Sequence, residues 1–117
     1  MITRNTARIA LGAVAAIAFT ASASAANIEG NWRTQSGANA TIAKCGGSFC
    51  INITSGEHAG KRVGRVAAAS GNKYTGSVTD PGNGKTYSGS VIVNGGSLKM
   101  SGCVARVLCR SQTWSRR

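Results

Sequence analysis

Turn-forming residues interrupt this chain at short, regular intervals, and they limit what it can fold into more than any other feature. Gly, Asn, Pro and Ser gather in small clusters between runs of β-forming residues. The clusters lie at 37–39, 46–47, 55–56, 71–72, 80–84 and 94–96. The runs between them predict eight short strands, at 30–34, 40–45, 49–54, 62–68, 73–79, 85–93, 97–102 and 109–116. Strands of this length and spacing are typical of an all-β sandwich or barrel.

Apolar residues alternate along these runs with the period of two that a strand requires. The residues predicted to share inward faces are Phe49, Ile51, Ile53, Tyr74, Gly76, Val78, Tyr87, Gly89, Val91, Val93, Leu98 and Met100, with Gln112, Trp114 and Arg116 on one face of the last strand. No stretch after residue 26 keeps the apolar period of a helix over three turns. Val63 and Val66 have helical spacing, but Gly64 between them indicates a bulge in a strand instead.

Tight turns between successive strands favour antiparallel hairpins. Asn94 and Gly95 supply the positive φ angles of a tight hairpin, which predicts that 91–93 pairs with 98–100. When hairpin follows hairpin, the result is an up-and-down meander, and its closure removes the exposed strand edges. We therefore expect a small up-and-down antiparallel β-barrel. Gly76 and Gly89 on its inward face allow either room for one small ligand or a filled core with glycine at the bends.

The first 25 residues form an export signal. Arg4 and Arg8 make a basic start, residues 9–19 are apolar and uncharged, and residues 23–25 have the A-x-A form that signal peptidase accepts. This apolar run is too short for a bilayer span, which needs about 20 residues. We expect cleavage after Ala25, which leaves one domain over 26–117 and no transmembrane segment. A buried N-terminal helix or a membrane anchor is the alternative.

All four cysteines, Cys45, Cys50, Cys103 and Cys109, lie in the exported part. An even count in a short secreted chain predicts two disulfides, which a domain with so small a core needs for stability. Proximity favours the local pairs Cys45–Cys50 and Cys103–Cys109, each worth roughly 2 kcal/mol from loop closure. A long-range pair such as Cys50–Cys103, worth about 4 kcal/mol, remains an alternative, as does a four-thiolate zinc site.

The exported part is strongly basic. Removing Arg4 and Arg8 from the 14 Lys and Arg leaves 12 against three acids, a net charge of +9. This charge favours contact with acidic envelope lipid or glycan, although scattered charges also serve solubility alone. The densest groups supply the candidate anion-binding residues, which are Lys61, Arg62, Arg65, Arg106 and Arg110. No block of like charges forms a tail, and nucleic acid is not an expected partner.

Catalysis is not expected from this set of residues. His58 is the only histidine and lies in a polar segment that predicts an exposed loop. Its neighbour Glu57 points the other way along an extended chain, and a catalytic triad needs its base oriented by a third group. Asp80 precedes Pro81 in a turn, where Asp caps its own backbone. No cofactor or metal is expected, because the remaining ligand-type residues are not clustered.

The opening of the mature chain resembles a known class of barrel. Gly30-Asn31-Trp32 is similar to the start of lipocalin-like (calycin) barrels, in which a Trp closes one end and an Arg from the last strand covers it. The resemblance implies that Trp32, Trp114 and Arg116 close the barrel, with the Arg116 guanidinium stacked on the Trp32 indole.

A wider pattern is more specific than this short motif. Its parts are Gly30-x-Trp32-Arg33-Thr34, the paired Cys45 and Cys50, Asp80-Pro81-x-x-Gly84-Lys85-Thr86-Tyr87, the run from Leu98 to Cys103, and the run from Cys109 to Arg116. In this order they resemble an uncharacterised family of small exported bacterial proteins, a domain of unknown function regarded as lipocalin-like. The resemblance covers nearly the whole mature chain. That family often carries a longer segment with Asp and Pro after the second cysteine, whereas 52–65 is short and basic here.

These observations predict a non-enzymatic binding module that is periplasmic or secreted. It would use its basic surface on acidic envelope components, or its barrel on a small apolar ligand. The alternative is a periplasmic protein-interaction or inhibitor protein, because small lipocalin-like barrels with a Gly-x-Trp start occur among periplasmic protease inhibitors. An enzyme would require His58 and an acid or a serine to converge in one cleft.

Overall fold

A computed structural model of the chain describes residues 27–104 and 108–117. The predicted signal peptide and Arg106 lie outside these residues. The described residues form strands and turns without a helix, which confirms the all-β prediction. The strands are β1 (Gly30–Arg33), β2 (Asn39–Cys45), β3 (Ser48–Ile53), β4 (Arg62–Ser70), β5 (Lys73–Thr79), β6 (Thr86–Asn94), β7 (Ser97–Val104) and β8 (Leu108–Arg116). No described helix has the length and apolarity to cross a membrane.

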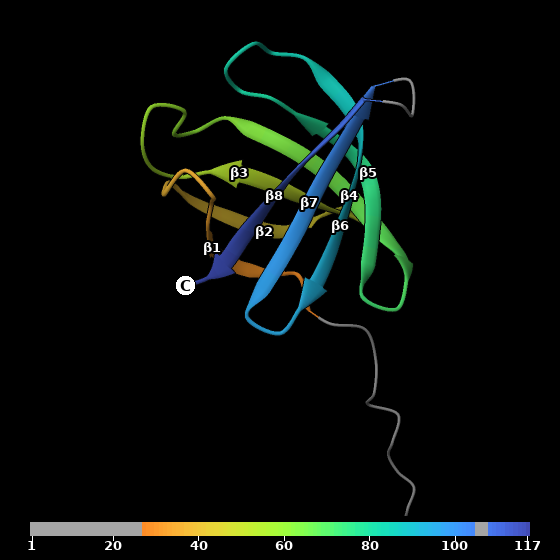
Figure 1. The fold of residues 1–117 in the computed structure, drawn as a ribbon. Helices are drawn as coiled ribbons and strands as arrows, with labels where there is room; N and C mark the ends of the chain where they lie inside the picture. Colours follow the sequence, from red (N-terminus) through yellow and green to blue (C-terminus); the bar gives the residue numbers. More distant parts are fainter. Residues whose placement is uncertain (1–26, 105–107) are drawn as a thin grey trace, which may run out of the picture.

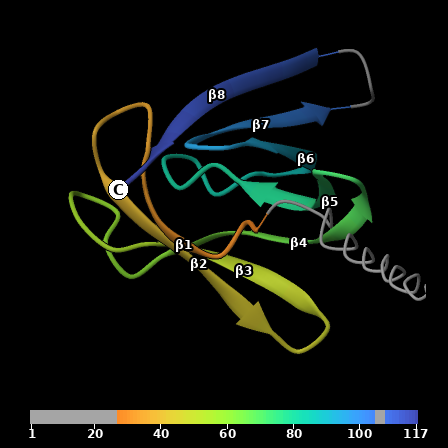
Figure 2. The ribbon, with the colours of Figure 1, turned by 90° about the horizontal axis from the view of Figure 1, so that it is seen from below.

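The strands form a closed barrel in which each strand pairs with its neighbours in the sequence (Figures 1 and 2). All pairs are antiparallel, so the topology is the predicted up-and-down meander. The barrel closes where β1 meets β8, with Trp32 opposite Arg116 and Arg33 opposite Ser115. Closure leaves no long unpaired edge for another chain to pair with.

The local irregularities fall where turn and glycine signals predict them. Val91 lies opposite Met100 and Val93 opposite Leu98, as expected for the hairpin around Gly95, whose φ is 57°. In β4 the register shifts because Val63 is an extra residue opposite β3, which is a β-bulge. The bulge lets Val63 and Val66 both face the core, despite their spacing.

Inward-facing side chains fill much of the barrel. The buried core consists of Ile28, Trp32, Ala40, Ile42, Ile51, Ile53, Val63, Val66, Tyr74, Val78, Val91, Val93, Leu98, Met100 and Trp114. Phe49 packs edge-on against Tyr74, with ring centroids 5.5 Å apart. The predicted alternation therefore selects the correct face of the strands, because successive side chains of a strand point to opposite sides.

Three glycines lie side by side in β5, β6 and β7. Gly76 is opposite Gly89, which is opposite Gly102. A Cβ on Gly76 would overlap the carbonyl oxygen of Arg65, and a Cβ on Gly89 would lie 2.7 Å from Cγ1 of Val78. The space at these glycines is therefore taken by neighbouring backbone and Val78. Glycine at such positions is typical of a bend in a strand. Gly102 also lines the open end of the barrel, and Gly76 and Gly89 border a shallow depression on the surface.

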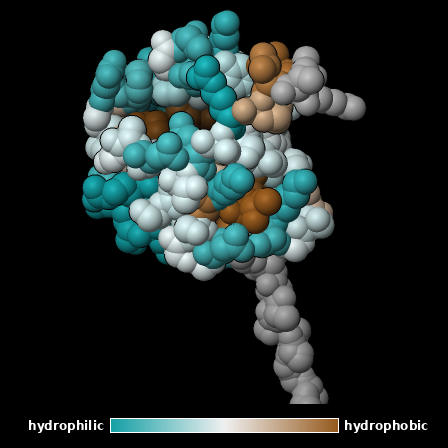
Figure 3. Space-filling view, in the orientation of Figure 1, coloured by the Kyte–Doolittle hydropathy of each residue, from teal (hydrophilic) through white to brown (hydrophobic). Residues whose placement is uncertain are grey.

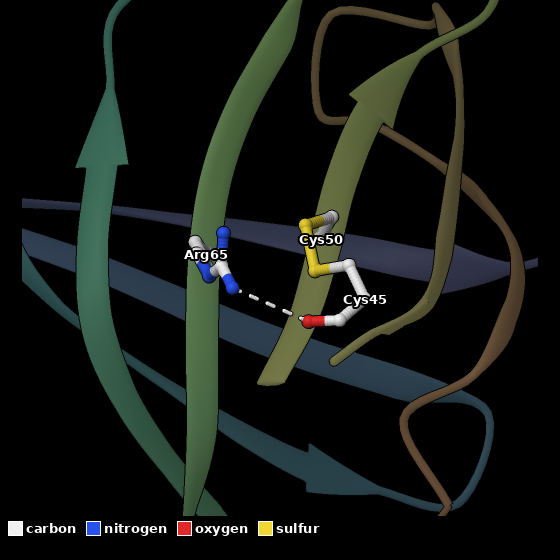
Figure 4. Close-up of a disulfide and its surroundings, with 3 residues drawn as sticks. All are labelled: Cys45, Cys50 and Arg65. Atoms are coloured by element: carbon white, nitrogen blue, oxygen red, sulfur yellow. Dashed lines mark hydrogen bonds between the residues drawn. A yellow bond between two sulfur atoms is a disulfide. The ribbon is translucent and has the colours of Figure 1, made fainter. Parts of the chain in front are cut away.

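Each disulfide joins the two strands of its own hairpin, β2 to β3 for the first and β7 to β8 for the second. Cys45 pairs with Cys50 and Cys103 with Cys109, with Cα–Cα distances of 5.8 Å and 4.0 Å. The local pairing is confirmed, and the long-range and zinc alternatives are excluded because no cysteine remains free. Beside the first disulfide, an Nη of Arg65 donates a hydrogen bond of 3.3 Å to the Cys45 carbonyl oxygen (Figure 4).

Candidate functional site

The two ends of the barrel differ in the length of their connections. At one end the strands are joined by the short turns 46–47, 71–72 and 95–96. At the other end the described connections are longer, at 34–38, 54–61 and 80–85. We call the first the closed end and the second the mouth.

The closed end is covered by the side chain of Arg116. Its guanidinium carbon lies 4.1 Å from the centroid of the buried Trp32 ring, the stacking that the lipocalin-like resemblance implies. The same guanidinium donates hydrogen bonds to the carbonyl oxygens of Glu29 (3.1 Å) and Asn27 (2.9 Å). Gly30 has a φ of 135°, and a Cβ there would lie 3.1 Å from Nη1 of Arg116. The glycine of the Gly-x-Trp motif thus makes room for the arginine.

The mouth opens into a hollow of about 680 Å³. Its apolar lining comes from inward-facing strand residues, which are Ile53, Val63, Val78, Met100 and Trp114. Its polar lining comes from the loops and strand ends, which are Thr34, Ser36, Ser55, Glu57, His58, Thr79, Asp80, Tyr87, Arg110 and Gln112. Figure 3 shows apolar atoms recessed among hydrophilic ones on the surface of the barrel. An apolar interior with a polar rim is the usual composition of a small-molecule site.

The loop between β3 and β4 carries Glu57 and His58 to the mouth. It folds back on itself through hydrogen bonds from Gly60 N–H to Ile53 C=O (2.7 Å) and from Lys61 N–H to His58 C=O (3.1 Å). His58 is therefore half-buried, which corrects the prediction of an exposed loop histidine. Its Nδ1 is buried and has no hydrogen-bond partner among the described residues.

The loop between β5 and β6 carries Asp80 to the same hollow. The backbone N–H of Asp80 donates to the Lys85 carbonyl oxygen at 2.8 Å. Its Oδ1 accepts a hydrogen bond of 2.8 Å from the Gly82 N–H, which is the self-capping turn that the sequence predicts. Asp80 also lines the hollow, and this second position was not predicted.

His58, two acids and two serines thus line one hollow, which is the convergence that an enzyme hypothesis requires. Their hydrogen bonds do not form a catalytic relay. The Ser36 hydroxyl bonds to the Thr34 hydroxyl at 3.1 Å, and the Ser55 hydroxyl accepts from the Asn39 N–H at 2.8 Å. No hydrogen bond joins the His58 imidazole to a described serine or acid, so nothing orients it as a base.

The predicted anion-binding residues lie on different sides of the barrel. Lys61, Arg62 and Arg65 are exposed at the start of β4, whereas Arg110 is on β8 and lines the mouth. β4 pairs with β3 and β5, and β8 pairs with β7 and β1, so the two groups are separated by the width of the barrel. Trp114, which was predicted to close the barrel together with Trp32 and Arg116, belongs to the buried core and lines the hollow.

Several residues of the hollow were predicted as parts of strands or of the family pattern, but not as parts of a site. Thr34, Met100 and Gln112 come from the first loop, β7 and β8. The up-and-down order places alternate connections at the same end of the barrel. This rule alone could have predicted that 34–38, 54–61 and 80–85 lie at one end.

Within the described residues, no group of three or more His, Cys, Asp or Glu side chains could hold a metal ion.

The fold and the hollow define a small closed β-barrel with one covered end and one open end. The chain belongs to a family described as uncharacterised proteins conserved in bacteria, DUF2147, whose family model matches residues 30–116. This confirms the resemblance to a bacterial domain of unknown function. No curated protein and no solved structure matches the chain.

Proposed function

We propose that this protein is a non-enzymatic binding module of the bacterial cell envelope that takes a small ligand into the mouth of its barrel. The hollow of about 680 Å³ carries this proposal. Its volume falls within the range of about 300 to 1,000 Å³ that is usual for small-molecule sites. The His58 imidazole has no described hydrogen-bond partner, and the Ser36 and Ser55 hydroxyls bond to other groups, which favours binding over catalysis. The two disulfides support residence in the periplasm or outside the cell, because disulfides persist in oxidising compartments.

Native mass spectrometry of the mature protein, purified gently from its own periplasm, tests this function. We expect a chain beginning at Ala26, lighter by four hydrogens for its two disulfides, and a reproducible added mass that survives dilution. The variant Ala38→Trp, which places an indole at the rim, should lose the added mass. Ala43→Trp, on an exposed position of β2 away from the hollow, should keep it. A bare wild-type mass would contradict a resident ligand and direct the search to the outer surface.

Contact with anionic lipid is a second candidate function, favoured by a separate observation. Val104 and Leu108 are paired at the outer end of β7 and β8, and they are 47% and 73% exposed. The Cys103–Cys109 disulfide joins the next residue pair along these strands, and the exposed Arg110 follows Leu108 by two positions on β8. Exposed apolar side chains near basic ones suit an anionic bilayer surface.

Vesicle flotation distinguishes lipid contact from binding to an envelope protein. We expect the protein to float with phosphatidylglycerol vesicles at low salt, and to be released by added salt or by Leu108→Ser. Ile92→Ser, which changes another exposed apolar side chain, is the matched control. If flotation is absent and a protease complex survives high salt, the inhibitor alternative is favoured.

A further inference from the structure

The residues that line the hollow carry the opposite net charge from the rest of the protein, although Lys61, Arg62 and Lys85 lie at the same end of the barrel outside that lining. Only three acidic residues occur in the whole chain, and two of them, Glu57 and Asp80, line the hollow. The third, Glu29, lies at the closed end, where its carbonyl oxygen accepts from Arg116. Arg110 is the single Lys or Arg among the described residues of the hollow. The charged groups around the hollow therefore sum to −1, although the exported chain as a whole carries 12 basic residues against three acids.

We infer that the mouth binds a small molecule with a primary ammonium group on an apolar body. This inference rests on the proposed function and names the chemical class of its ligand. A basic protein of this kind would be expected to take an anion, but its cavity presents carboxylates. Opposite charges attract most strongly where the surroundings exclude water, as in a hollow with apolar walls.

Both carboxylates retain free hydrogen-bonding capacity. Neither Glu57 nor Asp80 forms an ion pair with a described Lys or Arg, despite the excess of basic residues. Asp80 uses Oδ1 to hold its turn and makes no described hydrogen bond through Oδ2. The Gly82 N–H holds the Asp80 carboxylate in place before a ligand arrives, whereas the Glu57 side chain is exposed and only the backbone of its loop is fixed.

His58 supplies a third acceptor beside these carboxylates. Its buried Nδ1 has no partner among the described residues, and a buried polar atom without a partner is costly. In the tautomer with its proton on Nε2, Nδ1 accepts a hydrogen bond. A primary ammonium group has three N–H donors, enough for both carboxylates and, where the imidazole turns to expose Nδ1, for His58 as well. The body of the ligand would then lie against Val63, Met100 and Trp114 in the apolar part of the hollow.

Two fluorescent probes of equal length test the charge of the ligand. Dansylcadaverine ends in a primary ammonium group, and dansyl-6-aminohexanoate ends in a carboxylate. We expect the cationic probe to bind about tenfold more tightly at low salt, the effect of one or two partly exposed ionic contacts. Glu57→Gln combined with Asp80→Asn should abolish this preference, while the amide oxygen introduced by the second substitution still caps the turn. Glu29→Gln removes the acid at the closed end and should leave the preference unchanged.

The outcomes separate the inference from the proposed function. If both probes bind equally, or the anionic probe binds more tightly, and Ala38→Trp blocks both, the inference fails while the binding function stands. If the preference persists in the double variant, the two acids are not its source and the inference fails. A trimethylated dansylcadaverine that binds as tightly as the primary amine would overturn the hydrogen-bonding role of His58. If no probe binds at the mouth, the proposed function fails together with the inference.

Discussion

Arg116 connects parts of the chain that are far apart in the sequence. Its guanidinium stacks on Trp32 and binds the carbonyl oxygens of Asn27 and Glu29, so one side chain of β8 holds the segment that leads into β1. The Arg117 N–H also donates to the Asn31 carbonyl oxygen at 3.0 Å. Only two residue pairs join β1 to β8 in the sheet, so these side-chain contacts reinforce the shortest seam of the barrel.

Replacing Arg116 with Met should weaken this seam. Met keeps much of the apolar stem but loses the cation–π contact and both hydrogen bonds, so we expect a loss of about 1–3 kcal/mol in the free energy of unfolding. Urea denaturation followed by circular dichroism measures it. Arg117→Met, at a side chain without a described hydrogen bond, should change stability by less than about 0.5 kcal/mol. Equal effects of the two variants would show that Arg116 does not stabilise the closed end.

At the scale of elements, Gly76, Gly89 and Gly102 form a row in register across three neighbouring strands. Alternation along β5 and β6 points these positions inward, where a side chain would normally fill the core. Instead, the wall approaches itself so closely that Cβ atoms would clash with Arg65 and Val78. This close approach depends on the register that places the three glycines opposite one another.

Gly76→Ala should therefore destabilise the barrel. The added methyl group meets the backbone of Arg65 and Val66, which cannot move without breaking the pairing of β4 and β5, so we expect a loss of about 1–3 kcal/mol. Gly96→Ala is the matched control, because a Cβ there meets nothing within 4 Å. Thermal unfolding of both variants measures the difference. A Gly76→Ala protein as stable as the control would mean that the strands do not approach as described.

At the scale of the whole molecule, two disulfides cross-link a barrel that has only a small hydrophobic core. Each closes a short loop, with the cysteines five and six positions apart. Loops of this size stabilise a protein by roughly 2 kcal/mol each, a large share of the roughly 5–15 kcal/mol that holds a typical domain together.

Removing the disulfides one at a time should give unequal losses. Cys50 is buried while Cys109 is exposed, so a Cys45→Ala/Cys50→Ala variant loses packing as well as the cross-link. We expect it to lose more unfolding free energy than Cys103→Ala/Cys109→Ala, which should lose about 2 kcal/mol. Urea denaturation under oxidising conditions measures both variants, and reduced wild-type protein provides the combined loss. A larger loss for the Cys103 and Cys109 variant would contradict this ranking.

Local patterns in the sequence were sufficient to predict the strands and the all-β class, and they favoured the disulfide pairing that the structure shows. The alternation of Tyr74 and Val78, the turn at Gly95 and the bulge at Gly64 each depend on a few neighbouring residues, so they can be read without a structure. The proximity of Cys45 to Cys50 and of Cys103 to Cys109 is likewise local. The pairing of Trp32 with Arg116 is not local, and it was expected only because the motif resembles that of a known class of barrel.

By itself the sequence determined an all-β chain of short hairpins with four cysteines and a strong positive charge, because periodicity and turn chemistry act over a few residues, whereas the structure decided which cysteines pair. The tertiary structure alone decided where the open space lies and which side chains face it. Glu57, His58 and Asp80 lie on two different loops, and both the half-burial of His58 and the net negative charge of the lining of the hollow arise only when those loops meet at one end of the barrel. Convergence of this kind depends on how the whole barrel closes, which no single segment of the chain encodes.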